Sequence, residues 1–213
     1  MTSEPRRITL AFTGASGLPY GFRLLECLLA SGAQVALVYS VAAQVVARQE
    51  CDVTLPAQPR EAARLLRERY PSGTGRLDVH SRDDWLAPMA SGSNPGDGMA
   101  ICPCTMGTLG AIAAGIADNL IERAADVMLK ERRPLVLVPR ETPLSAIHLE
   151  NMLKLARAGA VILPPSPGFY TRPQAVADLV DFVVARVLDH LGVRHALVPR
   201  WGDEPSPPAS TSA

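Results

Sequence analysis

Two short turns in this sequence contain the small residues that often surround a bound phosphate group. Gly14–Gly17 follows a short apolar run and precedes a helical pattern, and Pro103–Thr108 has the same position after a later run. In such turns the backbone approaches a ligand closely, and free N–H groups at the start of the helix attract an anion. Gly14–Gly17 is only a G-x-x-G pattern, so a plain tight turn with Ser16 as the helix cap explains it as well.

Two cationic residues, Arg123 and Lys130, stand seven positions apart in a predicted helix and therefore share one of its faces. Two cations on one face can hold a phosphate between them. The alternative is a solvated face on which Glu122 and Glu131 pair with the cations, and the spacing alone favours that alternative.

Polar residues also stand directly after two predicted strands. Arg140 and Glu141 lie in the turn Pro139–Pro143, which follows the apolar run 135–138. Charged residues have little structural reason to occupy a proline-braced turn at that edge, so the pair favours a functional role. Ser40 follows an earlier run, where it either faces a ligand or caps the next helix.

A stiff, proline-rich loop, Pro164–Tyr170, follows another predicted strand. It carries two aromatic side chains, which either line a site or form a structural corner. Arg186, on the helix after this loop, could return to the same region. Cys104 is expected to be a small buried residue rather than a nucleophile, because no His or basic residue lies near it in the sequence.

Alternating strands and helices are expected to position these segments. The predicted strands are 8–12, 35–39, 99–102, 135–138 and 160–163, and the predicted helices are 19–30, 42–50, 105–114, 118–132, 145–158 and 174–191. Continuous apolar strands separated by helices predict a doubly wound α/β domain, whose mostly parallel sheet is covered on both faces. The segment 56–98 is less regular. It contains a charged helix, 60–70, and is expected to form an excursion at the edge of the sheet.

Length and composition restrict the class of protein. The chain has 213 residues, 47% of them hydrophobic, which predicts one domain over 1–202 and a disordered Pro/Ser-rich tail over 203–213. Lys+Arg and Asp+Glu number 21 each, so there is no basic excess to favour nucleic-acid binding. No apolar run is long enough to span a membrane, and the polar start of the chain favours the cytoplasm. The four Cys and four His residues lack the spacing of metal ligands, so no metal is expected.

Five segments closely resemble the UbiX-type flavin prenyltransferases. They are Gly14–Gly17 (GASG), Pro103–Leu109 (PCTMGTL), Asp118–Leu144 (DNLIERAADVMLKERRPLVLVPRETPL), His148–Met152 (HLENM) and Pro164–Pro173 (PPSPGFYTRP). The resemblance extends over residues 7–192, and the long central block is its most specific part. It implies a flavodoxin-like fold of the Rossmann type, assembled into a homododecamer.

The resemblance also implies site residues. The flavin, FMN, is expected to contact Gly14, Ala15, Ser16, Ser40, Thr105, Met106, Gly107, Thr108 and Arg140. Dimethylallyl phosphate is expected to contact Arg123, Lys130, Arg140, Glu141, Tyr170 and Arg186, several of them from a neighbouring subunit, with Trp85 and Trp201 around the prenyl group. Glu50 corresponds to a carboxylate near the reacting flavin. Thr105 stands where many relatives have Ser, and it keeps the hydroxyl.

The implied reaction joins the dimethylallyl group to N5 and C6 of reduced FMN, and the prenylated FMN then serves a UbiD-type decarboxylase. The residue types suit this chemistry, because Arg and Lys can neutralise the leaving phosphate in place of a metal. Trp and Tyr offer electron-rich faces to a developing allyl cation. Glu141 is expected to protonate the leaving phosphate, and Ser16 and Glu50 to handle the flavin protons.

Two other functions belong to different classes. Flavin-dependent cysteine decarboxylases share the fold, but they use a catalytic His and a P-x-M-N-x-x-M-W loop. This sequence has no His before His80 and has Pro-Arg-Glu-Thr-Pro in the matching loop. A non-catalytic flavin carrier would bind FMN alone, and FMN has one phosphate. The cationic set Arg123, Lys130, Arg140 and Arg186 exceeds what that phosphate needs.

Overall fold

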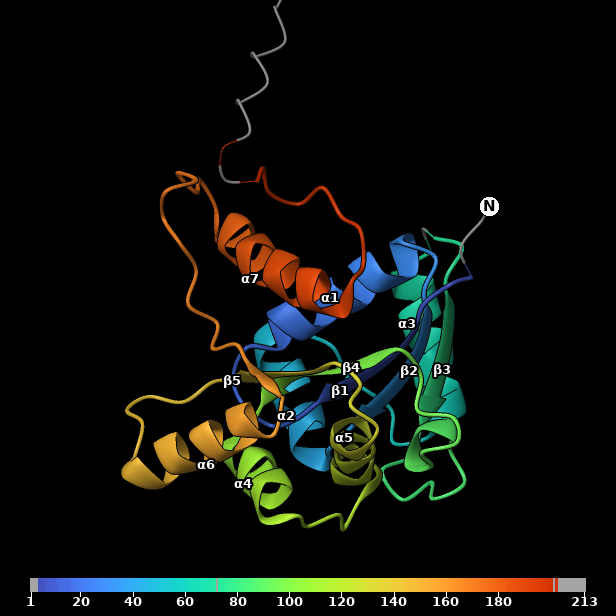
Figure 1. Ribbon diagram of the computed structural model, residues 1–213. Helices are drawn as coiled ribbons and strands as arrows, with labels where there is room; N and C mark the ends of the chain where they lie inside the picture. The colour runs from blue at the N-terminus through green and yellow to red at the C-terminus, as the bar shows by residue number, and fades with distance from the viewer. Residues whose placement is uncertain (1–3, 72, 201, 203–213) are drawn as a thin grey trace, which may run out of the picture.

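The computed structural model describes residues 4–71, 73–200 and 202. Its centre is a six-stranded parallel sheet in the order β3-β2-β1-β4-β5-β6 (Figure 1). The strands are β1 (Arg7–Phe12), β2 (Gln34–Tyr39), β3 (Arg76–His80), β4 (Gly98–Cys104), β5 (Leu135–Pro139) and β6 (Val161–Ile162). The strand order reverses between β1 and β4, and sheets of this kind bind ligands at the carboxyl ends of the strands beside that point.

Helices cover both faces of the sheet, which completes three layers (Figure 1). One face carries α1 and α7, which pack on each other, and the opposite face carries α4 and α5. Around these, α2 packs against α1, α3 against β3 and α6 against α4. The helices are α1 (Leu18–Ala30), α2 (Val41–Cys51), α3 (Pro59–Arg69), α4 (Met106–Ala114), α5 (Leu120–Lys130), α6 (Ala146–Arg157) and α7 (Val176–Leu191). This confirms the predicted flavodoxin-like, Rossmann-type fold.

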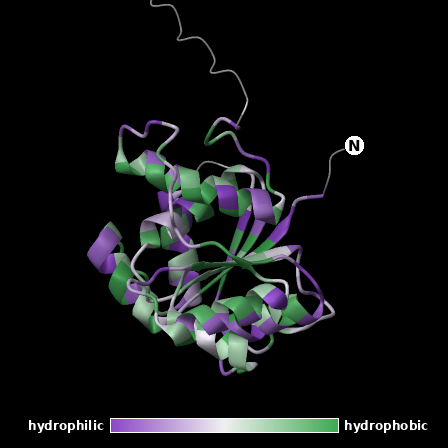
Figure 2. Ribbon diagram, turned by 60° about the vertical axis from the view of Figure 1, so that its left-hand side comes forward, coloured by the Kyte–Doolittle hydropathy of each residue, from purple (hydrophilic) through white to green (hydrophobic). Residues whose placement is uncertain are grey.

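The central strands are buried on both faces, which explains their continuous apolar sequences. In β1, Leu10 and Phe12 pack into the core under α1 and α7, whereas Ala11 packs into the core under α4 and α5. Figure 2 shows the hydrophobic residues gathered in the strands and on the inner faces of the helices. None of the helices in the described part of the chain is long and apolar enough to cross a membrane.

The segment 56–98 is more regular than its sequence predicts. Besides α3 it contains β3, which forms the edge of the sheet next to β2. Leu77 and Val79 of β3 pack against the core, but the residues between and beside them are Arg76, Asp78 and His80. An edge strand with one polar face has no continuous apolar run, and for this reason the sequence prediction missed it. At the other edge, β6 is only two residues long.

Candidate active site

The predicted flavin-binding segments meet at the carboxyl edge of the sheet. Phe12 of β1 lies beside Tyr39 of β2, and Cys104 of β4 lies beside Pro139 of β5. Because the strands are parallel, the turns that follow them lie at the same edge. These turns carry Gly14–Ser16, Ser40, Thr105–Thr108 and Arg140, so the structure brings all four predicted segments together.

Thr13 connects the turn after β1 to the turn after β4. Its hydroxyl donates to the Pro103 carbonyl at 2.8 Å and accepts from the Thr105 backbone N–H, also at 2.8 Å. The residue is buried, so these bonds are shielded from water. Thr13 was not among the residues predicted from the sequence, although its place directly after a strand was an available signal.

The turn Gly14–Gly17 is held by a carboxylate and not by its own serine. Gly17 is the N-cap of α1, has a φ of 119°, and provides no side-chain cap. Glu50, near the end of α2, accepts hydrogen bonds from the backbone N–H groups of Gly17 at 2.8 Å and Leu18 at 3.0 Å. The interpretation of Ser16 as a plain helix cap is therefore wrong. A carboxylate at this helix terminus also interacts favourably with the helix dipole.

Close packing with α2 fixes the position of the same turn. A Cβ atom added at Gly14 would lie 2.3 Å from the Cβ atom of Ala42. Only glycine therefore fits at this position. Ser40, directly before α2, caps that helix by accepting from the Ala43 N–H at 3.1 Å. The capping interpretation of Ser40 is confirmed. Ser40 also lies at the carboxyl edge of the sheet, directly after β2.

The N-terminus of α4 forms the second turn of the site. The hydroxyl of Thr105 accepts from the Thr108 N–H at 3.2 Å and donates to the Thr108 hydroxyl at 3.0 Å. A Cβ atom added at Gly107 would meet no atom of the described residues within 4 Å, in contrast to Gly14. The first turn of α4 therefore combines N–H groups that lack helical partners with open space beside Gly107.

Arg140 and Glu141 leave β5 at the same edge. The Arg140 Nε atom donates to the Ser16 carbonyl at 3.2 Å, which joins the turns after β5 and β1. Glu141 is exposed, and its carboxylate accepts from the N–H of the following residue, Thr142, at 3.1 Å. A carboxyl group here is open to solvent and to a ligand.

The two cations of α5 lie beside the segment 88–93. Arg123 donates from Nε to the Ala90 carbonyl at 2.9 Å and pairs with Asp126 at 2.9 Å. Lys130 pairs with Glu131 at 2.5 Å. Of the two glutamates expected to pair with the cations, Glu131 pairs with Lys130. Glu122 instead accepts from the Asp118 N–H, and the N-cap of the helix is Asn119.

The other residues predicted to bind dimethylallyl phosphate are more widely spread. Arg186 lies on α7, on the face of the sheet opposite to α5, and pairs with Asp189 at 2.8 Å. Tyr170 is 58% exposed and stacks edge-on against Phe182, with 5.7 Å between the ring centres. Trp85 follows β3 and is half exposed. Trp201 and the predicted tail 203–213 lie outside the described residues.

Cys104 lies at the end of β4 but cannot readily act as a nucleophile. Its side chain is fully buried, and burial raises the pKa of its thiol to about 12. Burial also raises the pKa of the neighbouring Cys102 thiol. At neutral pH the thiolate of Cys104 is almost absent, which agrees with the predicted structural role. Among residues 4–71, 73–200 and 202, no group of three or more His, Cys, Asp or Glu side chains is placed to hold a metal ion.

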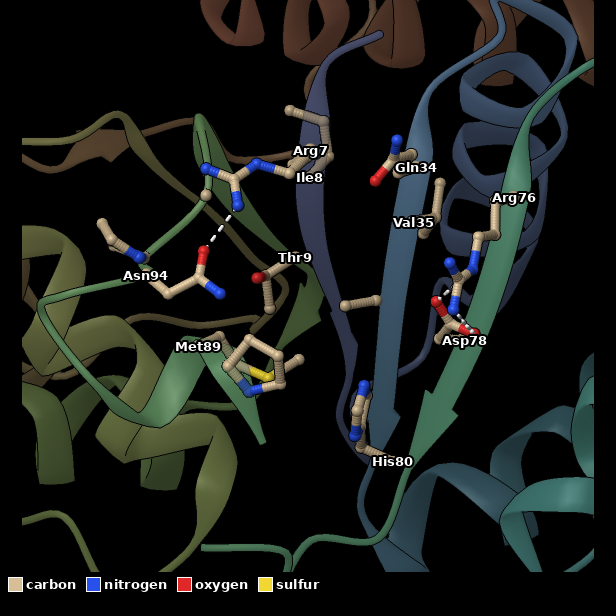
Figure 3. A pocket seen from close by; sticks show the side chains of 14 residues that line it. Arg7, Ile8, Thr9, Gln34, Val35, Arg76, Asp78, His80, Met89 and Asn94 are labelled. Carbon is tan, nitrogen blue, oxygen red and sulfur yellow. Dashed lines mark hydrogen bonds and ion pairs between the residues drawn. The ribbon is translucent and has the colours of Figure 1, made fainter. Parts of the chain in front are cut away.

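A separate cavity of about 250 Å³ lies under the segment 88–96, against β1, β2 and β3 (Figure 3). Figure 3 shows the guanidinium of Arg7 directed at Asn94, and that of Arg76 directed at Asp78. Of the predicted site residues that the structure describes, none lines this cavity. This cavity is therefore separate from the flavin-binding residues that the sequence predicts.

Comparisons with known proteins match nearly the whole chain. The family model Flavoprotein matches residues 1–188. The flavin prenyltransferase UbiX of Pseudomonas aeruginosa is 58% identical over 95% of this chain and 97% of its own length. That of Methanocaldococcus jannaschii is 44% identical over 92% of this chain and 98% of its own length.

Two solved structures are similar over nearly all of the chain. AnUbiX, in complex with FMN and dimethylallyl pyrophosphate, has a TM-score of 0.83 and 42% identity over 95% of this chain and 100% of its own. A dodecameric FMN-dependent UbiX-like decarboxylase from Escherichia coli has a TM-score of 0.80 and 43% identity over 92% and 100%. The cysteine decarboxylase TvaF, at 19% identity over 88% of this chain and 98% of its own, and a TM-score of 0.53, shares the fold alone. With this extent of identity over its whole length, the chain belongs to the UbiX family of flavin prenyltransferases.

Proposed function

We propose that the protein joins the dimethylallyl group of dimethylallyl phosphate to N5 and C6 of reduced FMN. One observation carries the proposal: Gly14–Ser16, Thr105–Thr108 and Arg140 meet at one edge of a parallel sheet, and Arg140 contacts Ser16 directly. The 58% identity to a flavin prenyltransferase supports it, as does the presence of FMN and dimethylallyl pyrophosphate in AnUbiX.

The flavin-binding residues of the proposal are those at the carboxyl edge of the sheet. They are Gly14, Ala15, Ser16, Ser40, Thr105, Met106, Gly107, Thr108 and Arg140. The open space at Gly107 fits a bulky ligand that rests on the backbone. The first-turn N–H groups of α4 and the guanidinium of Arg140 suit a phosphate.

A second set of residues would bind the phosphate donor. It consists of Arg123, Lys130, Arg140, Glu141, Tyr170 and Arg186, with Trp85 and Trp201 around the prenyl group. Arg123 and Lys130 are on α5, which lies on the opposite face of the sheet from α7, the helix that carries Arg186. We therefore infer that the sites are shared between copies in a homo-oligomer, and a dodecamer such as the Escherichia coli relative is the assembly we expect.

Exposed apolar side chains support such an assembly. Ile147, Leu149 and Leu153 of α6 are each more than half exposed, and so are Val41 and Val45 of α2. Apolar residues that gather on outward helix faces mark surfaces that are covered by a partner. We therefore expect these faces of α2 and α6 to be buried between copies.

The residue types at the site account for the chemistry. The reduced flavin, when bound, supplies the nucleophilic N5 and C6 positions. Arg123, Lys130 and Arg186 neutralise the charge that develops on the leaving phosphate, which takes the place of a metal ion. Glu141 protonates that phosphate, and Ser16 and Glu50 move protons at the flavin edge. Aromatic faces and the exclusion of water favour a developing allyl cation.

The chemical nature of the product implies an enzyme that receives it. Prenylated FMN is a modified cofactor, so an enzyme that makes it requires a recipient, and we expect a UbiD-type decarboxylase. Release of the product from a site at the subunit boundary would then precede its capture by that enzyme.

The test is an anaerobic incubation of the protein with reduced FMN and dimethylallyl phosphate, followed by mass spectrometry of the extracted flavin. The expected result is a flavin heavier by one prenyl unit, both before and after exhaustive chelation of divalent metals. Unmodified FMN would contradict the proposal and would favour a flavin carrier. Loss of activity on chelation and its recovery with magnesium would contradict the metal-free mechanism alone.

A further inference from the structure

The guanidinium of Arg123 is held from two directions. Its Nε atom donates to the carbonyl of Ala90, 33 residues earlier in the chain, at 2.9 Å. One of its terminal nitrogens donates to the carboxylate of Asp126, one helical turn further along α5, at 2.9 Å. A guanidinium has five N–H groups, so about three remain for another partner once these two are used.

We propose that Asp126 is a positioning residue that orients Arg123 toward the phosphate of the prenyl donor. This inference rests on the proposed function, because it takes the phosphate of that donor as the partner of the remaining N–H groups. Asp126 itself would not touch the donor. Its role is to limit the rotation of a long side chain, so that less conformational entropy is lost when the phosphate binds.

The surroundings of Arg123 support a fixed arrangement. A Cβ atom added at Gly92 would lie 2.4 Å from the ammonium nitrogen of Lys130, so the segment Ala90–Gly92 lies directly against both cations of α5. The hydroxyls of Ser91 and Ser93, on either side of Gly92, contact each other at 2.9 Å. Arg123 and Lys130 are thus arranged along one strip of backbone.

Electrostatics alone predicts the opposite effect for Asp126. A carboxylate beside Arg123 reduces the net positive charge that a phosphate dianion meets, so its removal should strengthen phosphate binding if charge were its only contribution. If Asp126 positions Arg123, its removal should weaken phosphate binding. Removal of Asp126 should therefore raise the Kd of the prenyl phosphate if Asp126 positions Arg123, and lower it if only its charge matters.

The experiment compares Asp126→Ala and Asp126→Asn with the wild-type protein in calorimetric titrations of dimethylallyl phosphate into the protein loaded with oxidised FMN, with no reductant. We expect Asp126→Ala to raise the Kd of the prenyl phosphate about threefold to tenfold and to leave the Kd of FMN unchanged. Asp126→Asn should fall between wild type and Asp126→Ala, because its amide oxygen still accepts a hydrogen bond from Arg123.

The matched control is Glu26→Ala. Glu26 pairs with Arg23 at the same i,i+3 spacing, at 2.8 Å and with similar exposure, but on α1. The Glu26→Ala variant should leave the Kd of the prenyl phosphate unchanged. In a double-mutant cycle, Asp126→Ala should have no further effect once Arg123 is Ala, since no guanidinium remains to be oriented.

Tighter or unchanged binding in Asp126→Ala, or an equal loss in the Arg123→Ala background, would overturn the positioning role. Prenylation of FMN by the wild-type protein is measured in a separate assay. If the wild type prenylates FMN while Asp126→Ala binds the donor normally, only this inference fails. If the wild type neither prenylates FMN nor binds the donor, the proposed function fails first.

Discussion

The Nε atom of Arg140 donates a hydrogen bond of 3.2 Å to the backbone carbonyl of Ser16, a residue 124 positions away. The strand order is β1-β4-β5 at this point, so the Arg140 side chain reaches across the end of β4. Two of the turns predicted to bind ligand are thereby coupled. A change at Arg140 would alter the Gly14–Ser16 turn as well as any direct ligand contact, which makes other residues better probes of the site.

Gly14→Ala should destabilise the protein and weaken FMN binding. The new methyl group would lie 2.3 Å from the Cβ atom of Ala42, so the Gly14 turn and the start of α2 must move apart. Overpacking of this kind costs about 1–3 kcal/mol. Thermal unfolding and flavin titration measure both effects.

The double variant Gly14→Ala/Ala42→Gly is the control, because it removes the opposing Cβ atom. It should recover much of the lost stability and FMN affinity. Gly107→Ala tests the other turn. Its new methyl group would meet no atom of the described residues within 4 Å, so the fold should be unaffected while FMN affinity falls. Normal FMN affinity in Gly107→Ala would show that the flavin does not rest on α4 at this position.

Glu50→Ala should lower both the free energy of unfolding and the affinity for FMN. It removes the oxygen that accepts from Gly17 and Leu18, and loss of a helix cap typically costs about 1 kcal/mol. Glu50→Gln keeps an oxygen that can accept both hydrogen bonds, so stability and FMN affinity should stay close to wild type while turnover slows. A wild-type rate for Glu50→Gln would limit Glu50 to its capping role.

Much of the fold is predictable from the sequence because buried parallel strands produce continuous apolar runs. The strands around 8–12 and 135–138 follow this rule, and the structure has them as β1 and β5. β3 escaped prediction because Arg76, Asp78 and His80 alternate with its two core residues at the sheet edge. A strand with only two alternating apolar residues has a sequence pattern that cannot be distinguished from that of a loop.

The positions of some candidate site residues are predictable for a related reason. Parallel strands bring their carboxyl ends to one edge, so Ser40 and Arg140 were expected there from the sequence alone. The partners of these residues were not predictable. Glu50 caps α1 from the end of α2, and Arg123 is held by Ala90 and Asp126. Such contacts depend on how helices pack, which no local pattern of residues specifies.

Arg123→Ala and Lys130→Ala should weaken use of the prenyl phosphate and leave FMN binding nearly intact. Both cations lie on α5 beside the segment 88–93, and the contacts described for them do not include the Gly14–Ser16 turn. Each would lose a charged contact of about 1.5–3 kcal/mol, which corresponds to about tenfold to a hundredfold in the KM of the donor. Flavin titration is the discriminating measurement. A comparable loss of FMN affinity would assign these cations to the phosphate of FMN.

Glu141→Gln should bind both ligands and turn over slowly. The Glu141 side chain is exposed directly after β5, where its carboxylate accepts only a local hydrogen bond from Thr142 among the contacts described for it. A carboxylic acid near a phosphate ester donates a proton as the C–O bond breaks, and an amide cannot, while Gln keeps the size and an acceptor oxygen for Thr142. General acid catalysis typically contributes about a hundredfold to ten-thousandfold, so the single-turnover rate of prenyl–flavin formation, with both ligands saturating, should fall within that range. A rate equal to wild type would mean that Glu141 donates no proton, and that the proton comes from solvent or from Glu50.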